Sequence, residues 1–164
     1  MADPPDGEYS RAPELEDLVE LCRRLNAAGV EYVLIGGFAV ILHGFVRGTK
    51  DIDLLVDASP ANVERIRRAL SYLEDNAVAE VADDEISRYA VVRVADEIVI
   101  DLMARACGID FEQATREGGI QTLYVEGTPV PVATKEMLIR MKDTVRPSDA
   151  ADVEYLKLRL SEGN

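Results

Sequence analysis

Apolar residues in the first regular segment of the chain recur every three or four positions, which predicts an amphipathic helix. This pattern follows Pro13, a residue suited to the first turn of a helix, and stops at Gly29. The apolar run 32–35 then predicts a short buried strand. Residues 38–43 predict a helix that begins almost directly after it, so the strand leads into the helix without a long loop.

A second region alternates apolar residues with Asp51 and Asp53 and predicts a strand over 51–56. Ser59 and Pro60 supply an N-cap and a first helical position, so a helix is expected to follow this strand. Two more strands joined by a tight turn are predicted next, over 89–94 and 97–103.

The second half of the chain predicts further elements in the order helix 110–116, strand 121–125, strand 128–132 and helix 134–146. Pro147 ends that helix, and Ser148 caps the last one. This order predicts an α/β (α+β) fold, a mixed β-sheet flanked by helices. Residues 1–12 lack periodicity and are rich in Pro, Asp and Gly, which predicts a flexible tail before a single domain over 13–164.

The composition is that of a globular protein, with 48% hydrophobic and 30% charged residues in a chain of 164. Two cysteines are too few for a disulfide framework. No apolar run approaches the roughly 18 residues of a membrane span. The N-terminal sequence also lacks the apolar segment of a secretion signal. We therefore expect a cytoplasmic protein that binds no membrane.

The formal net charge of −13 argues against an extended nucleic-acid-binding face, which requires a basic surface. It does not argue against a small anionic ligand such as a nucleotide, if metal ions and a few cationic side chains offset the repulsion. Most of the acidic residues are explained by solubility alone.

Candidate chemistry begins at Gly36 and Gly37, between the first strand and its helix. Glycines at such a junction allow the backbone to approach a phosphate, although a tight turn is the simpler explanation. Asp51 and Asp53 lie two positions apart on the next strand and therefore share one face. Two carboxylates on one face are typical Mg²⁺ ligands, yet such pairs also arise by chance in a chain with 31 acidic residues.

Asp101 is the decisive residue because its strand neighbours are almost all apolar. A carboxylate in such a strand requires a cationic partner, hydrogen bonds or a metal ion. If its strand lies beside that of Asp51, three carboxylates converge as two-metal phosphoryl or nucleotidyl transfer requires. The alternative is a salt bridge between Asp101 and an arginine.

In this order, paired glycines, a short helix, Asp-x-Asp on a strand and a lone aspartate on a later strand resemble the nucleotidyltransferase superfamily that includes polymerase β. The likeness is greatest to the small bacterial branch of minimal nucleotidyltransferases and AbiEii-like toxins. It covers residues 31–57, 97–103 and 134–156, and it implies the polymerase β-like fold with C-terminal helices.

The resemblance also implies roles for individual residues. Asp51, Asp53 and Asp101 would be the catalytic and metal-binding residues, holding Mg²⁺ or Mn²⁺, and Asp101 would help to deprotonate an acceptor hydroxyl. The implied nucleotide-binding residues are Gly36, Gly37, Arg47, Lys50, Lys142 and Arg146. Lys142 and Arg146 would share one helix face, with Asp149 or Asp152 following. Ion pairs to these aspartates are the alternative role for both cations.

The expected activity is Mg²⁺-dependent transfer of a nucleoside monophosphate from an NTP such as ATP to a hydroxyl of tRNA, of a protein or of a small molecule. The resemblance implies a toxin–antitoxin or phage-defence setting with a cognate toxin or antitoxin as partner. Phe38 stands where many members carry Ser or Thr. This difference favours the alternative of an inactive nucleotidyltransferase-like domain with a binding or regulatory role.

Overall fold

The computed structural model describes residues 10–144 and 146–163. This part of the chain contains both helices and strands. In order, they are α1 (Leu15–Ala27), β1 (Tyr32–Ile35), α2 (Gly36–Leu42), β2 (Asp51–Val56), α3 (Pro60–Leu70), the 3-10 helix η2 (Ala77–Glu80), α4 (Glu85–Arg88), β3 (Val92–Ala95), β4 (Val99–Met103), β5 (Arg105–Ala106), β6 (Ile109–Asp110), α5 (Phe111–Arg116), β7 (Ile120–Val125), β8 (Thr128–Ala133), α6 (Lys135–Met141) and α7 (Pro147–Ser161).

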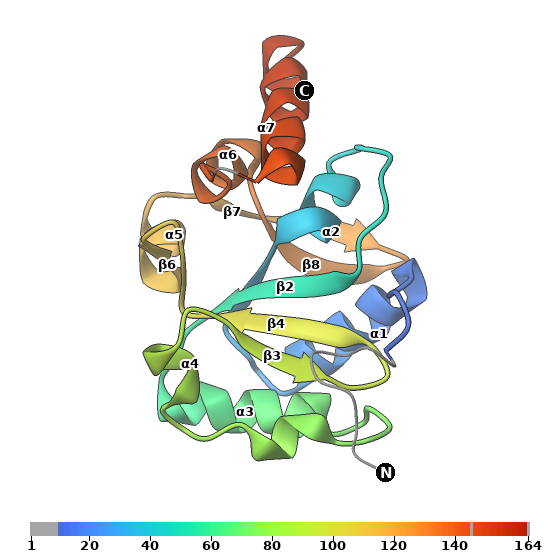
Figure 1. Ribbon diagram of the computed structural model, residues 1–164, viewed down its shortest axis with the longest axis vertical. Helices are drawn as coiled ribbons and strands as arrows, with labels where there is room; N and C mark the ends of the chain where they lie inside the picture. The colour runs from blue at the N-terminus through green and yellow to red at the C-terminus, as the bar shows by residue number, and fades with distance from the viewer. Residues whose placement is uncertain (1–9, 145, 164) are drawn as a thin grey trace.

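Six of the strands form one mixed sheet in the order β3-β4-β2-β1-β8-β7 (Figure 1). β2 runs parallel to β4 and antiparallel to β1, and β1 runs parallel to β8. The hairpins β3–β4 and β7–β8 close the two edges with antiparallel pairs. The fold is thus the expected mixed sheet flanked by helices. Because β2 and β4 are neighbours, the strands of Asp51 and Asp101 lie side by side.

Helices cover the sheet in two groups. α1 packs against α3, and α2 contacts both α6 and α7. Figure 1 shows α2, α6 and α7 gathered at one end of the molecule, with α3 at the other end and the last turns of α7 extending away from the body. Alternate residues of β2, Ile52 and Leu54, are fully buried in the core. Asp51 and Asp53 therefore point to the opposite face, toward α2.

Most of the predicted boundaries hold within one to three residues. Ser59 accepts a hydrogen bond from the backbone of Asn62 and caps α3, with Pro60 at the first helical position. Asp110 caps α5 in the same way. Pro13, however, lies just before the Glu14 N-cap of α1 rather than inside the helix. The short strands β5 and β6 were not predicted, because two residues each are too few to show a period.

The predicted helix over 134–146 is wrong in its second half. α6 ends at Met141, Lys142 is its C-cap, and Arg146 is the N-cap of α7. Pro147 disfavours helical backbone at the residue before it, and Arg146 is accordingly extended, with a φ of −72° and a ψ of 133°. Lys142 and Arg146 therefore do not share a helix face.

The predicted tail over 1–12 falls largely on residues 1–9, which lie outside the described residues. Ser10 and Arg11 are described, and both contact the β3–β4 turn. The Ser10 hydroxyl donates to the carbonyl of Asp96, and the backbone N–H of Arg11 donates to the carbonyl of Glu97. This end of the expected tail is therefore held against the domain.

Candidate metal centre

Three carboxylates from two neighbouring strands converge on one face of the sheet. In the β2–β4 register, Asp53 lies opposite Asp101, and Asp51 is two residues from Asp53 on the same face. One oxygen from each of the three lies within 4.8 Å of the others. Asp101 is 5% exposed, whereas Asp51 and Asp53 are partly exposed. The convergence expected if β2 and β4 were neighbours is thus present.

The position of Asp53 depends on Gly36. A Cβ atom added to Gly36 would lie 2.0 Å from Oδ2 of Asp53, so only glycine leaves space for this carboxylate. Gly36 also has a φ of +72°, in the left-handed region that favours glycine. The missing side chain of Gly36 therefore makes room for the carboxylate of Asp53.

The carboxylates repel one another. Burial and the neighbouring Asp51 and Asp101 raise the pKa of Asp53 to about 7, and the positive charges of Lys142 and Arg146 only partly oppose them. Burial and Asp101 also raise the pKa of Asp51, against the opposing charge of Arg93. The cluster thus holds more negative charge than its surroundings balance, which is the electrostatic condition for a cation site.

Arg93 is a functional candidate that the sequence did not reveal. It lies on β3 directly opposite Asp101. Its Nε donates to Asp101 Oδ1 and its Nη2 to Asp101 Oδ2, both at 2.9 Å, while Nη2 also lies 3.2 Å from Asp51 Oδ2. The salt bridge considered as the alternative for Asp101 is therefore present together with the carboxylate cluster. The only sequence signal is the alternation Val92-Arg93-Val94, which points Arg93 away from the core.

A hydroxyl lies beside Gly37, although it does not come from residue 38. Phe38 is 4% exposed and packs into the core. A Cβ atom added to Gly37 would lie 2.8 Å from Thr49 Oγ1 and 3.4 Å from Arg47 Nη2. The loop before β2 thus brings a hydroxyl and a guanidinium to the strand–helix junction. Thr49 was missed by the sequence analysis, because its closeness to Gly37 depends on how this loop folds back.

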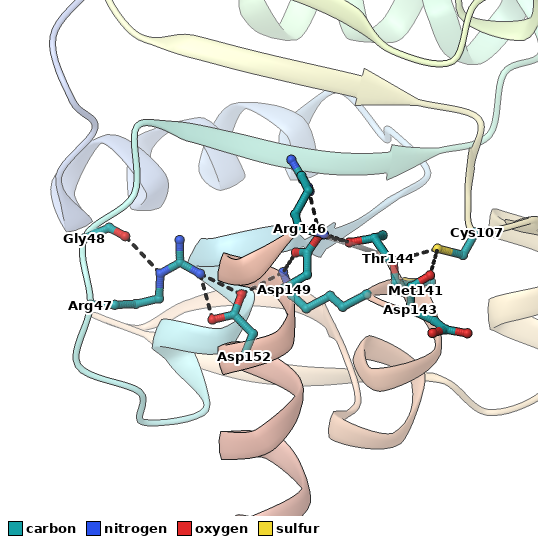
Figure 2. Close-up of polar contacts among 10 residues, drawn as sticks. Arg47, Gly48, Cys107, Met141, Asp143, Thr144, Arg146, Asp149 and Asp152 are labelled. Carbon is teal, nitrogen blue, oxygen red and sulfur yellow. Dashed lines mark hydrogen bonds and ion pairs between the residues drawn. The ribbon is translucent and has the colours of Figure 1, made fainter.

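A compact network of charges joins the segment between α6 and α7, the first turns of α7 and the loop before β2 (Figure 2). Asp152 is 1% exposed and accepts hydrogen bonds from Arg47 Nη1 at 2.7 and 2.6 Å, and its Oδ2 lies 3.0 Å from Lys142 Nζ. Asp149 lies 3.4 Å from Lys142 Nζ and accepts from Arg146 Nε at 2.9 Å. The ion pairs considered as the alternative role for Lys142 and Arg146 are thus formed.

Hydrogen bonding in this network lowers the pKa of Asp149. Burial acts to raise that pKa, but hydrogen bonds from Thr144 and Arg146 and the charge of Lys142 outweigh it. Arg146 remains 73% exposed, while Lys142 is almost fully buried. Lys50 is exposed at the end of the loop, immediately before Asp51. Of the expected nucleotide-binding cations, Arg146 and Lys50 therefore have the most accessible side chains.

A separate hollow of about 810 Å³ lies at the opposite end of β2, lined by Val56, Asp57, Ser59, Ala104, Phe111 and Thr115 among others. None of the three clustered aspartates lines it. The carboxylates are at the amino end of β2, so this hollow is not part of the candidate centre.

The donor set of the cluster fits a hard divalent cation. Mg²⁺ and Mn²⁺ prefer oxygen ligands, and Mg²⁺ is commonly held by one or two carboxylates together with substrate phosphates. A divalent cation placed between Asp51, Asp53 and Asp101 would also offset the repulsion that raises the pKa of Asp53.

The fold resembles that of two solved proteins. One is a candidate nucleotidyltransferase from Thermotoga maritima, with a TM-score of 0.57, 19% identity and coverage of 90% of this chain and 92% of that chain. The other is an antigenic nucleotidyltransferase-like protein from Paracoccidioides brasiliensis, with a TM-score of 0.50, 18% identity and coverage of 90% and 77%. At these identities the likeness concerns the fold. No curated protein sequence matches the chain.

A family model described as nucleotidyltransferase of unknown function (DUF6036) matches residues 14–103. This segment is more than half of the chain and runs from α1 to the end of β4, so it includes the glycine junction and all three aspartates. Within the described part of the chain, none of the helices has the length and apolar composition of a membrane span. The chain belongs to the DUF6036 family of nucleotidyltransferases.

Proposed function

We propose that the protein is a Mg²⁺-dependent nucleotidyltransferase that transfers a nucleoside monophosphate from an NTP to an acceptor hydroxyl. The observation that carries this proposal is the convergence of Asp51, Asp53 and Asp101 within 4.8 Å on one face of the sheet. A cluster of this charge is unfavourable by itself and becomes useful when it binds cations that also bind phosphates. Membership of a nucleotidyltransferase family supports the same chemistry.

In the proposed reaction, the acceptor oxygen forms a bond to the α-phosphorus of the NTP. The bond from that phosphorus to the bridging oxygen breaks, and pyrophosphate leaves. Asp101 would receive the proton of the acceptor hydroxyl, directly or through water. When bound, Mg²⁺ would supply charge neutralisation at the phosphates. The chain's own contribution would be positioning and electrostatic stabilisation.

Phosphate binding would come from the junction between β1 and α2, from the loop before β2 and from the segment between α6 and α7. Thr49 and Arg47 lie beside Gly37, so their hydroxyl and guanidinium can donate to phosphate oxygens there. Arg146 is exposed, and its positive charge acts to lower the pKa of Asp53, which supports a role for this side chain at the cluster. The ion pairs of Arg47 and Lys142 with Asp152 would hold these cations in place.

The acceptor is a hydroxyl of tRNA, of a protein or of a small molecule, and the net charge of −13 disfavours a long nucleic acid. In a toxin–antitoxin system, a cognate partner protein would be expected. A second candidate function is an inactive nucleotide-binding or regulatory domain. The observation behind it is the hydrogen-bonded contact of Arg93 with both oxygens of Asp101, the proposed base.

The test combines binding with transfer. ATP and Mg²⁺ together should raise the melting temperature of the wild type, and the double variant Asp51→Ala/Asp53→Ala should lose this shift. Incubation with ATP labelled at the α-phosphate should label an acceptor in a mixture of tRNA and protein, whereas γ-labelled ATP should not. Labelling from γ-phosphate alone would indicate a phosphotransferase. Binding without any transfer would support the regulatory domain, and absence of any nucleotide or metal effect would contradict both functions.

A further inference from the structure

Arg93, Asp101 and Asp53 form a row across three neighbouring strands. The antiparallel register pairs Arg93 with Asp101, and the parallel register pairs Asp101 with Asp53. Cross-strand partners point to the same face of a sheet, so the backbone register places the side chain of Arg93 beside the carboxylates. The contact between Arg93 and Asp101 therefore follows from the register of two strands.

The guanidinium binds the oxygens that a metal ion would use. Arg93 contacts both oxygens of Asp101 at 2.9 Å and one oxygen of Asp51 at 3.2 Å. A bidentate arginine–carboxylate pair is planar and uses one lone pair of each carboxylate oxygen. A cation held between Asp51 and Asp101 therefore meets the Nη2 group of Arg93 in the same space and is also repelled by its charge.

We propose that Arg93 is a built-in counter-ion of this centre, which a divalent cation displaces from Asp51 and Asp101 when it binds. Arg93 is then a positioning residue that lowers the metal affinity of the ligand-free protein and holds Asp101 until the metal ion arrives. The inference rests on the proposed function, because it takes the three aspartates as the metal ligands.

Arg93 is accessible from solvent at the edge of the sheet. Arg93 lies on β3, the edge strand of the sheet, and its side chain is 40% exposed. Release of the guanidinium toward solvent therefore needs no change in the backbone. Release also gives the metal ion access to the two oxygens of Asp101 that the guanidinium occupies.

The test measures metal binding in the absence of nucleotide. Titration of the folded protein with Mn²⁺, followed by electron paramagnetic resonance of free Mn²⁺, gives the dissociation constant. Arg93→Met removes the charge and keeps an unbranched side chain, and it should bind Mn²⁺ at least about tenfold more tightly than the wild type, because a unit charge a few ångströms from the ion is removed. The Mn²⁺ affinity of Arg93→Lys should lie between those of the wild type and Arg93→Met, because an ammonium cannot form the bidentate pair.

Arg88→Met is the matched control. Arg88 is also an arginine near β3, but its partner is the exposed Asp84 at 3.4 Å, outside the cluster. This variant should bind Mn²⁺ like the wild type. In metal-free buffer, Arg93→Met should melt at a lower temperature than the wild type, and Mn²⁺ should raise its melting temperature by more than it raises that of the wild type.

The outcomes separate the two proposals. If the wild type binds Mn²⁺ and Arg93→Met binds it equally or more weakly, Arg93 is part of the metal centre rather than its competitor, and the counter-ion role is overturned while the proposed function stands. If neither the wild type nor Arg93→Met binds Mn²⁺, both the metal centre and the counter-ion role are overturned.

Discussion

The carboxylate of Asp53 occupies the space where any side chain on residue 36 would begin, with only 2.0 Å between Asp53 Oδ2 and an added Cβ atom. One glycine thus determines both the β1–α2 turn and the position of a proposed metal ligand. Gly36→Ala should therefore displace Asp53. We expect this variant to lose Mn²⁺ binding and to lower the free energy of unfolding by more than the about 1–2 kcal/mol that a left-handed backbone alone costs an alanine.

Gly29→Ala is the control for this first prediction. Gly29 has the same φ of +72°, but a Cβ atom added there meets nothing within 4 Å. Gly29→Ala should lower the free energy of unfolding only by the cost of a left-handed backbone, and it should keep the wild-type Mn²⁺ affinity. Urea unfolding and Mn²⁺ titration of both variants measure the two effects. Equal losses of stability in the two variants would mean that Asp53 moves aside without cost.

A second prediction concerns the repulsion within the cluster. The folded-state pKa of Asp53 is about 7, above the ordinary value of 3.8. A carboxyl group with a raised pKa favours folding fully below its unfolded pKa and loses this contribution as the pH rises through the folded pKa. The metal-free protein should accordingly lose stability on this account between about pH 4 and pH 8.

Asp53→Asn removes the charge and should stabilise the metal-free protein at pH 8 by on the order of 2–4 kcal/mol. The gain should shrink toward zero near pH 4, because Asp53 is then protonated in the folded wild type as well. Thermal unfolding in EDTA across this pH range measures the difference. A gain that does not depend on pH would show that repulsion among the carboxylates is not its source.

The sequence predicted the elements that carry the aspartates because their periods are local. Ile52 and Leu54 alternate with Asp51 and Asp53, and this alternation alone assigns the two faces of β2. The role of Arg93 was not predictable in this way, because it depends on the β3–β4 register. A shift of that register by one residue would place a valine opposite Asp101 and turn Arg93 to the other face of the sheet.

The difference between local pattern and contacts distant in sequence also explains the error at the end of α6. The local sequence pattern predicts a helix that continues to Arg146, because Pro147 is the first residue that clearly ends it. The helix ends earlier because Thr144, Lys142 and Arg146 all contact the buried Asp149, and these contacts require a turn in the chain. Tertiary hydrogen bonds to a buried carboxylate outweigh helix propensity, and a single sequence does not show which carboxylate will be buried.

A third prediction concerns Asp152, a buried member of the network in Figure 2. It is 1% exposed and pairs with both Arg47 and Lys142. Asp152→Asn keeps the shape but leaves the buried Lys142 without this partner's charge. Removing one member of a buried ion pair costs about 3–5 kcal/mol, and we expect a loss of stability near the lower value because Asp149 also neutralises Lys142.

The matched control is Glu112→Gln, which breaks an exposed ion pair with Arg116 at 3.4 Å. Its effect should stay within about 0.5 kcal/mol. Urea unfolding of both variants measures the free energies. A loss as small for Asp152→Asn as for the control would mean that water or a neighbouring side chain replaces the lost ion pairs.

A fourth prediction tests whether Thr49 provides the hydroxyl that Phe38, buried in the core, does not. Thr49 Oγ1 lies beside the Cα of Gly37 and donates to the carbonyl of Asp51 at 3.1 Å. If this hydroxyl turns from the carbonyl of Asp51 and donates its proton to an NTP phosphate, Thr49→Val should weaken binding of Mg²⁺–ATP by about tenfold, the effect of one hydrogen bond to a charged group. Thr49→Ser should keep the affinity, because only the methyl group is lost.

Isothermal titration with Mg²⁺–ATP compares the variants, and the Mn²⁺ affinity without nucleotide serves as the internal reference. Thr49 is not a proposed metal ligand, so Thr49→Val should bind Mn²⁺ like the wild type while it binds ATP more weakly. Parallel losses of both affinities would instead show that Thr49 acts by holding the backbone of Asp51. Wild-type ATP binding by Thr49→Val would place the phosphates away from Gly37, nearer to the exposed Arg146.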